Sequence, residues 1–208
     1  TWAVMTQKAG WTARGGHTSV ALADGSIVLM GGSDGANKND TWRSTDNGTT
    51  WTRMNASSGW TERRYHSSVA LPDDSIVLMG GYDGSNMNDV WRSTDYGATW
   101  TLMNASAGWP ARYGHTSVAL ADGSIVLMGG YTGSYMNDVW RSTDNGATWT
   151  RLANAGWLVR SSQRSVALPD GSILVLGGES GARKTDVWRL TTAGSSDPDP
   201  SHTYTDPG

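Results

Sequence analysis

Residues 75–100 read SIVLMGGYDGSNMNDVWRSTDYGATW, and this stretch decides the fold because the chain repeats it. The Gly-Gly pairs that end the apolar run begin at Gly31, Gly80, Gly129 and Gly177, so successive copies lie 49, 49 and 48 residues apart. A period near 50 residues is typical of a propeller or a solenoid. The chain is therefore an array of four units, and its function must be sought in the loops.

Each unit predicts four short strands. In the first unit, residues 18–22 alternate apolar and small polar side chains, Asp24-Gly25 follows, and residues 26–30 form a continuous apolar run. An Asp-Gly pair supplies the positive φ angles of a hairpin turn. We expect a third strand at 39–43 and a fourth at 51–54, which predicts an all-β fold with one sheet per unit.

A second pattern, S-x-D-x-G-x-T-W, occurs at 44–51, 93–100 and 142–149, between the expected third and fourth strands. In such a turn the aspartate can accept backbone N–H groups, the glycine can adopt a positive φ, and the tryptophan can cover the hairpin. The structural set predicted for these turns is Asp46, Asp95, Asp144, Trp51, Trp100 and Trp149.

These residues carry a resemblance to known repeats. The Gly-Gly pair followed by Asn-Asp-Val-Trp at 88–91 resembles a kelch repeat, and the turn at 93–100 resembles the Asp-box, or BNR-type hairpin, of sialidases and sortilin-type receptors. The combined match covers about residues 1–190. Both resemblances imply β-propeller blades, and both motifs occur in proteins of many functions.

The ends of the array suggest how it closes. Thr1-Trp2-Ala-Val-Met5 aligns with residues 50–54, a fourth strand without its blade, while the last unit stops after its third strand at Arg189. If residues 2–5 pair with 186–190, four four-stranded blades close into a propeller with no free edge. Alternatively, the first strand completes a blade of a neighbouring chain and makes a strand-exchanged dimer or filament.

The division of the chain follows from the same repeat. Residues 1–190 are expected to form the propeller of four repeats. Residues 191–208, rich in Pro, Ser, Thr and Asp, are expected to form a flexible tail or linker.

Composition excludes several function classes. The 208 residues carry a net charge of −3, which argues against the phosphate contacts of nucleic-acid binding, and contain no cysteine. No apolar run approaches the roughly 20 residues of a membrane helix. No cofactor and no metal are expected. Sequons, which permit N-glycosylation of a secreted protein, occur at Asn39, Asn47, Asn55 and Asn104, and we expect an extracellular or cell-surface location.

Strand alternation places the loops that follow Gly-Gly on one face with the long connections between units. This face is rich in aromatic and arginine side chains, which suit carbohydrate or peptide recognition. The predicted ligand residues are Tyr65, Tyr82, Tyr113, Tyr131, Tyr135, Trp60, Trp109, Arg63 and Arg112. The alternative for the tryptophans is packing between blades, because a tryptophan recurs there in every unit.

A second set precedes each first strand, which in propellers lines the central channel. It consists of Arg14, Arg63, Arg112, Arg160, His17, His66 and His115. Three hypotheses remain for it: a structural role, which the kelch resemblance implies, an anion site at the channel mouth, or a metal site. We align Arg164 with the histidines in the fourth unit, where its cation would repel a metal.

Enzymatic activity is not expected. A sialidase would need a catalytic glutamate within a larger constellation, but Glu62 and Glu179 are the only glutamates and lie in different loops. A galactose-oxidase type of kelch enzyme would need a cysteine. Paired aspartates such as Asp34 and Asp83 leave glycoside chemistry as a third possibility.

Two functions from different classes remain. The first is a noncatalytic extracellular or cell-surface module that binds glycan or protein through the aromatic face. The second is a structural surface protein that self-assembles into oligomers or filaments by strand exchange.

Overall fold

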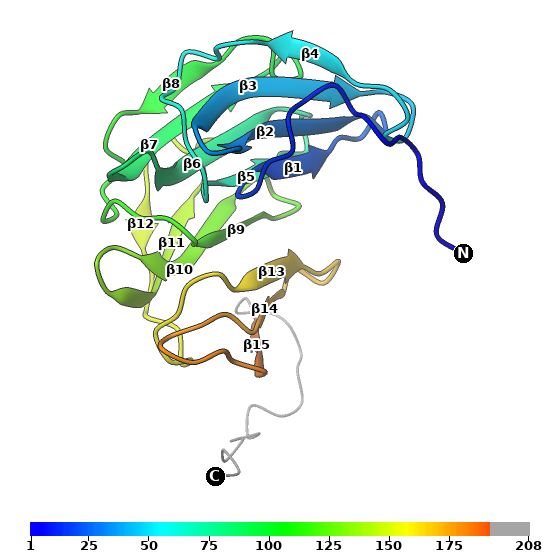
Figure 1. The fold of residues 1–208 in the computed structure, drawn as a ribbon. Coiled ribbons are helices and arrows are strands. Elements are labelled where there is room, and N and C mark those ends of the chain that lie inside the picture. The colour runs from blue at the N-terminus through cyan, green and yellow to red at the C-terminus, as the bar shows by residue number, and fades with distance from the viewer. Residues whose placement is uncertain (192–208) are drawn as a thin grey trace.

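The computed structural model describes residues 1–191, and they form only β-strands, turns and loops (Figure 1). Each sheet is antiparallel and pairs in chain order. The first sheet contains β1 (Thr18–Ala21), β2 (Ile27–Ser33), β3 (Asn37–Ser44) and β4 (Thr52–Asn55), and the second contains β5 (Ser67–Ala70), β6 (Ile76–Tyr82), β7 (Asn86–Ser93) and β8 (Thr101–Asn104). The third contains β9 (Thr116–Ala119), β10 (Ile125–Tyr131), β11 (Tyr135–Ser142) and β12 (Thr150–Arg151), and the fourth contains β13 (Arg164–Ala167), β14 (Ile173–Leu176) and β15 (Val187–Leu190).

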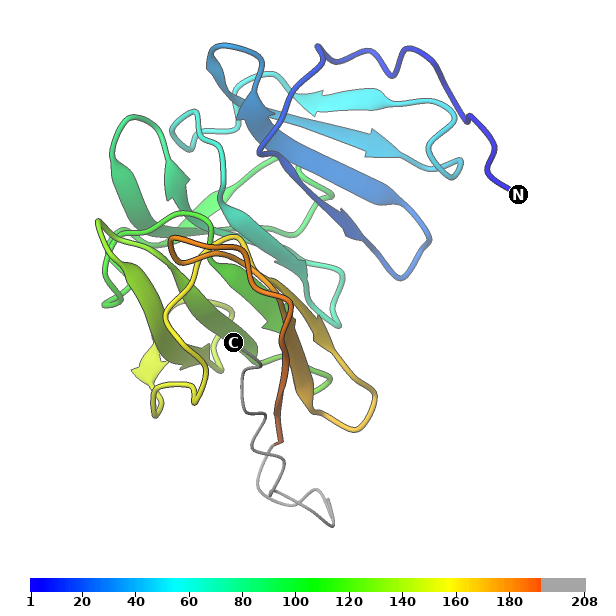
Figure 2. The ribbon, with the colours of Figure 1, turned by 60° about the horizontal axis from the view of Figure 1, so that its bottom comes forward.

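The four sheets are the blades of a β-propeller. Strands β1, β5, β9 and β13 contact one another in succession, so the first strand of each blade is innermost, as a second view shows (Figure 2). The expected four-bladed all-β propeller is confirmed, and we number the blades one to four along the chain.

The Gly-Gly pairs are required by backbone conformation and by space. Gly80 and Gly81 have φ of 55° and 111° and lie at a register shift between β6 and β7. A Cβ added to Gly81 would lie 2.9 Å from Cβ of His66 and 3.0 Å from the carbonyl oxygen of Arg64. Only glycine fits both constraints. Glycine therefore lets the second strand of each blade lie close to the loop that precedes the first strand.

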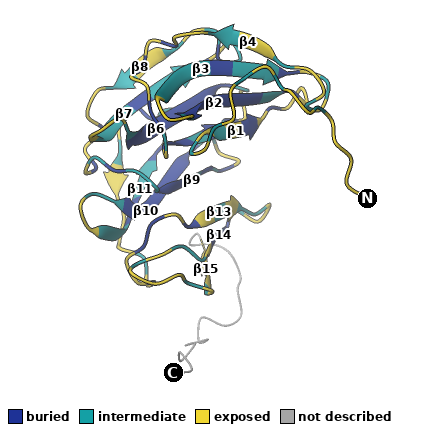
Figure 3. Cartoon of the chain, in the orientation of Figure 1, coloured by how far each residue is buried: buried dark blue, intermediate teal, exposed yellow. Residues whose placement is uncertain are grey.

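The hydrophobic core lies between blades rather than at one centre. Every residue of β6 except Tyr82 is buried, and the second strands are the most buried elements of the first three blades (Figure 3). Three clusters of buried side chains occupy the three successive blade interfaces. Each fully buried Ile, Leu, Met or Val contributes about 1.5–3 kcal/mol, so the repeated interfaces hold the array together.

The expected closing strand is not formed. The last sheet has three strands within residues 1–191, residues 1–5 form no strand, and Trp2 is fully exposed. The N-terminal segment lies apart from β15 in Figure 1. The reason is geometric: three successive interfaces fix the rotation of each blade, and together they do not bring blade four against blade one.

Apart from Thr191, the tail predicted at 191–208 lies outside the described residues. Within residues 1–191, no helix is long and apolar enough to span a membrane.

Candidate functional site

The two predicted faces of the propeller are present. Backbone bridges join Gly15 to Ser33 and Lys38 to Arg63, so the loops after Gly-Gly lie beside the long connections. At the other end of the blades, Arg43 donates to Asp24, which joins the hairpin of β1 and β2 to the end of β3. We call the first of these ends the loop face and the second the turn face.

The turn face is occupied by hydrogen bonds within its own loops. Asp46 accepts the backbone N–H of Thr50 at 2.9 Å and the Thr50 hydroxyl at 2.7 Å, while Gly48 has φ of 87°. The indole Nε1 of Trp51 donates to the carbonyl of Gly48 at 3.1 Å. Asp95 and Asp144 hold their turns in the same way, so these side chains fix backbone geometry and leave little for a ligand.

The arginines of the channel-mouth set form ion pairs with aspartates of their own units. The guanidinium of Arg112 donates to both oxygens of Asp138 at 2.6 and 2.7 Å, to the carbonyl of Gly129 at 2.8 Å and to that of Pro110 at 3.0 Å. Arg14, Arg63 and Arg160 do the same with the aspartates of their own units, which are Asp40, Asp89 and Asp186. The side chains of Arg63, Arg112 and Arg160 are fully buried. An anion could reach them only by breaking these pairs, so we do not propose an anion site here.

The histidines pair with the neighbouring blade. Nε2 of His66 lies 2.8 Å from the hydroxyl of Thr18, and Nε2 of His115 lies 2.8 Å from that of Ser67. Burial, reinforced by the charge of the adjacent arginine, lowers the pKa of each to about 3, so both are neutral at pH 7. Burial also lowers the pKa of His17.

The sequence analysis predicted Arg164 at the fourth position of the histidine set, and this prediction is wrong. Gln163 occupies that position. Arg164 begins β13 and is therefore the equivalent of Thr116, which begins β9. The fourth unit is one residue shorter before Trp157, and this deletion shifts the register. Gln163 is fully buried and donates to the carbonyl of Met128 at 2.8 Å. No group of acidic or histidine side chains within residues 1–191 is arranged to hold a metal.

Four of the predicted ligand residues are not accessible. Trp60 and Trp109 are 1% exposed, and Arg63 and Arg112 are fully buried. Trp60 packs edge-on against Trp100 of the next blade, with ring centroids 6.0 Å apart. These side chains belong to blade interfaces, because a large aromatic at the same place in every unit fills the same gap each time.

The five predicted tyrosines do come together on the loop face. Tyr113 lies at their centre, with ring centroids 5.9 Å from Tyr65, 5.4 Å from Tyr82 and 5.5 Å from Tyr131. Tyr135 extends the group, 5.2 Å from Tyr131. Tyr65 is 47% exposed and the other four are half-buried, so all five side chains are partly accessible to a ligand. We call these five residues the tyrosine cluster.

Backbone hydrogen bonds at the channel mouth fix the position of Tyr65. The N–H of Tyr65 donates to the carbonyl of Gly16 at 2.8 Å, that of Gly114 to Tyr65 at 3.0 Å, and that of Ser162 to Gly114 at 2.7 Å. All four residues have φ between 57° and 67°, a region that disfavours a side chain such as that of tyrosine. A strained tyrosine where equivalent positions carry glycine or serine is a common sign of a functional position.

Arg64 completes the cluster, and the sequence analysis missed it. Its guanidinium carbon lies 5.3 Å from the ring centroid of Tyr65 and 5.6 Å from that of Tyr82. Arg64 occupies the position of Tyr113 in the preceding unit, so its side chain varies between units, and this variation could have identified it. Burial and then the neighbouring tyrosines raise the pKa of Tyr113, which is therefore neutral at pH 7.

Three of the four sequon asparagines donate their side-chain amide within the fold. Asn55 donates to the carbonyl of Ala98 and Asn104 to that of Ala147, both at 2.7 Å and both between blades. Asn39 donates to the carbonyl of Trp60 at 3.1 Å. Asn47 is exposed at a turn and is the sequon best placed for modification.

Comparison with known families matches residues 2–196 to the KLHDC2/KLHL20/DRC7 Kelch-repeats domain. A comparison with curated proteins found no significant match. The match spans all four units. The chain therefore belongs to the family of KLHDC2/KLHL20/DRC7 Kelch-repeats domains.

Proposed function

We propose that the chain is a noncatalytic protein-interaction module whose partner binds the tyrosine cluster and Arg64. Membership in a Kelch-repeats family supports protein interaction as the class of function. The observation that carries the proposal is the cluster itself, in which five partly exposed rings are in contact on one face. Tyrosine offers a rigid apolar ring and a hydroxyl at low entropic cost, which suits a binding surface.

The scaffold does not require these tyrosines. The position of Tyr82 and Tyr131 carries Ser33 in the first unit and Glu179 in the fourth, and all four versions form the same backbone bridge. Because the blade tolerates different side chains at this position, the tyrosines there are free to serve partner binding.

Arg64 indicates the chemistry of that partner. Within residues 1–191 its side chain forms no ion pair, although it is half-buried against two tyrosine rings. A carboxylate of the partner would satisfy this cation, and apolar or aromatic side chains would cover the rings. The proposed ligand is therefore a polypeptide segment with at least one carboxylate.

The test is selection from a random peptide library on the immobilised protein. Peptides enriched on the wild type should carry acidic and apolar residues, and they should lose at least ten-fold in affinity on Tyr82→Ala, Tyr131→Ala and Arg64→Ala. The matched control is Tyr96→Ala, because Tyr96 contacts Arg43 away from the cluster. Equal binding by all variants, or glycan-array binding with no peptide enriched, would contradict the proposal.

The location outside the cell remains part of this proposal. Its support is the exposed sequon at Asn47. Expression with a secretion signal, followed by mass measurement before and after glycosidase treatment, would test whether that site is used.

A further inference from the structure

The first two blade interfaces each use a tryptophan that directly precedes the outer strand of the following blade. Trp100 packs edge-on against Trp60, and Trp149 packs edge-on against Trp109, with centroids 6.0 and 6.1 Å apart. Trp157 is the equivalent of Trp60 and Trp109 in the interface between blades three and four. Within residues 1–191, no aromatic ring packs on Trp157 in this way, so this interface lacks one component.

A cavity of about 360 Å³ lies at that place. Its wall is mainly apolar and includes Met128, Val139, Leu152, Trp157, Val175 and Trp188. The repeat equivalents of these six residues, in the same order, all belong to the core between blades two and three: Met79, Val90, Met103, Trp109, Leu127 and Trp140. That core also contains Trp149, whose equivalent is the missing ring. The cavity is therefore the vacant position of an outer-strand tryptophan.

The edge of the last blade is open beside this cavity. Strand β15 pairs with β14 and with no other strand of the described chain, and all four of its residues are exposed. In blade one, the equivalent strand β3 pairs Arg43 with Thr52 and Trp42 with Arg53. An exposed strand edge with apolar side chains is a template for another strand.

The sequence supplies that strand at the other end of the chain. Trp2 and Met5 occupy the positions of Trp51 and Met54, and both are exposed here, Trp2 completely. After β15, the position equivalent to Trp149 carries Asp197, so the last unit has no tryptophan of its own to offer. Residues 1–5 are the segment that matches the cavity and the edge.

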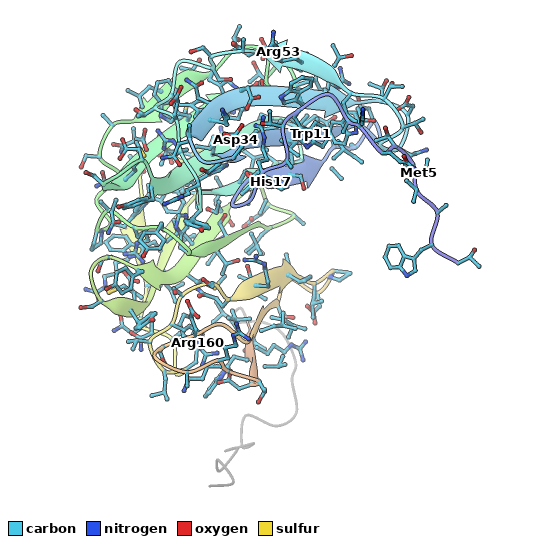
Figure 4. The ribbon with its side chains drawn as sticks, viewed as in Figure 1. Met5, Trp11, His17, Asp34, Arg53 and Arg160 are labelled. Atoms are coloured by element: carbon cyan, nitrogen blue, oxygen red, sulfur yellow. The ribbon has the colours of Figure 1, made fainter. Side chains whose placement is uncertain are left out.

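The blade that accepts this segment must lie directly against blade one. Trp11 is fixed in blade one, with ring centroids 4.5 Å from Trp51 and 6.0 Å from Trp42. Five residues separate Met5 from Trp11, and five also separate Met54 from Trp60. The connection from Met54 to Trp60 crosses one blade interface, so a connection of the same length from Met5 to Trp11 can cross only one. Blade four of the same chain is not in that place, and Figure 4 shows Met5 on a segment that lies well apart from Arg160.

We propose that residues 1–5 of a second copy of this chain add to β15 as the fourth strand of the last blade, with Trp2 in the cavity against Trp157. Blade four of one copy then packs against blade one of the other. When two copies exchange strands reciprocally, both open edges are covered and assembly stops at a dimer. This interface does not involve the tyrosine cluster, so it is independent of the proposed peptide binding.

The first test is the solution mass by light scattering over a concentration series. The intact chain should form a dimer. Trp2→Ala should raise the dissociation constant of the dimer at least ten-fold without changing the circular dichroism spectrum. The matched control is Val4→Arg, because the equivalent positions carry the exposed Arg53 and Arg151, and it should leave the dimer intact. A monomeric wild type, or a dimer indifferent to Trp2→Ala, would overturn the proposal.

A disulfide trap separates a second copy from the chain's own N-terminus. The ladder pairs Arg141 with Thr150, so the proposed register pairs Arg189 with Ala3. The chain has no cysteine, so the double variant Ala3→Cys/Arg189→Cys carries only the two new thiols, and the single variants Ala3→Cys and Arg189→Cys, which should give no covalent dimer, control for bonds between like positions of two copies. Mild oxidation should give a covalent dimer on a non-reducing gel. An internal disulfide in a monomer, or no disulfide, would contradict exchange between copies, while peptide binding would be unaffected in either case.

Discussion

Arg63 and Arg64 are neighbours in the sequence but behave in opposite ways. Arg63 is fully buried, paired with Asp89, and has an arginine equivalent in every unit. Arg64 faces the tyrosine cluster, and its equivalents are Gly15, Tyr113 and Ser161. In a repeat protein, a side chain present in all units therefore indicates the scaffold, whereas a side chain that differs between units marks a position free to acquire function.

The largest expected effect tests the scaffold half of this comparison. Arg112→Ala should lower the free energy of unfolding by about 3–5 kcal/mol, because it leaves the carboxylate of Asp138 buried without its partner. The side chain of Asp138 is 2% exposed, whereas that of Asp186 is 39% exposed. Arg160→Ala should cost less, since water can solvate Asp186. Denaturant unfolding of both variants measures the difference, and equal losses would show that burial of the aspartate is not the cause.

A slightly smaller effect should come from the buried histidines. Their folded pKa of about 3 lies below the usual value of 6.5, so the unfolded chain binds protons first as the pH falls. Stability should be complete above pH 6.5 and should fall by about 2–4 kcal/mol between pH 7 and pH 5. The pKa of Asp186, lowered to about 2 mainly by its hydrogen bond from Arg160, affects stability only below about pH 4.

The control for the histidines comes from the fourth unit, where Gln163 occupies their position. The double variant His66→Gln/His115→Gln should fold and should lose most of the pH dependence between pH 5 and 7 in thermal unfolding. An unchanged pH profile in that variant would assign the effect to other groups.

The smallest effect on stability should come from the tyrosine cluster, whose residues differ between units. Tyr65→Gly should change the free energy of unfolding by no more than about 1 kcal/mol, because relief of the positive φ of 57° offsets the lost ring contact. Gly114→Ala, at the equivalent position with φ of 62°, should instead destabilise the fold by about 1 kcal/mol. If Tyr65→Gly proved as damaging as Arg112→Ala, the cluster would be part of the scaffold and the comparison would fail.

The sequence by itself determined the four units, the strand order in each blade and the two faces, because hydrophobic period, Gly-Gly pairs and turn residues act locally. It also identified all five tyrosines that meet on the loop face. Only the tertiary structure decided that Trp60 and Arg63 are buried and that Arg64 joins the cluster. It also decided that Gln163 occupies the fourth position of the histidine set. The tertiary structure also decided that Trp2 is exposed and that residues 1–5 form no strand beside β15. These outcomes depend on how one blade is placed against the next, and that placement is set by packing between residues about 50 positions apart, which a local pattern does not contain.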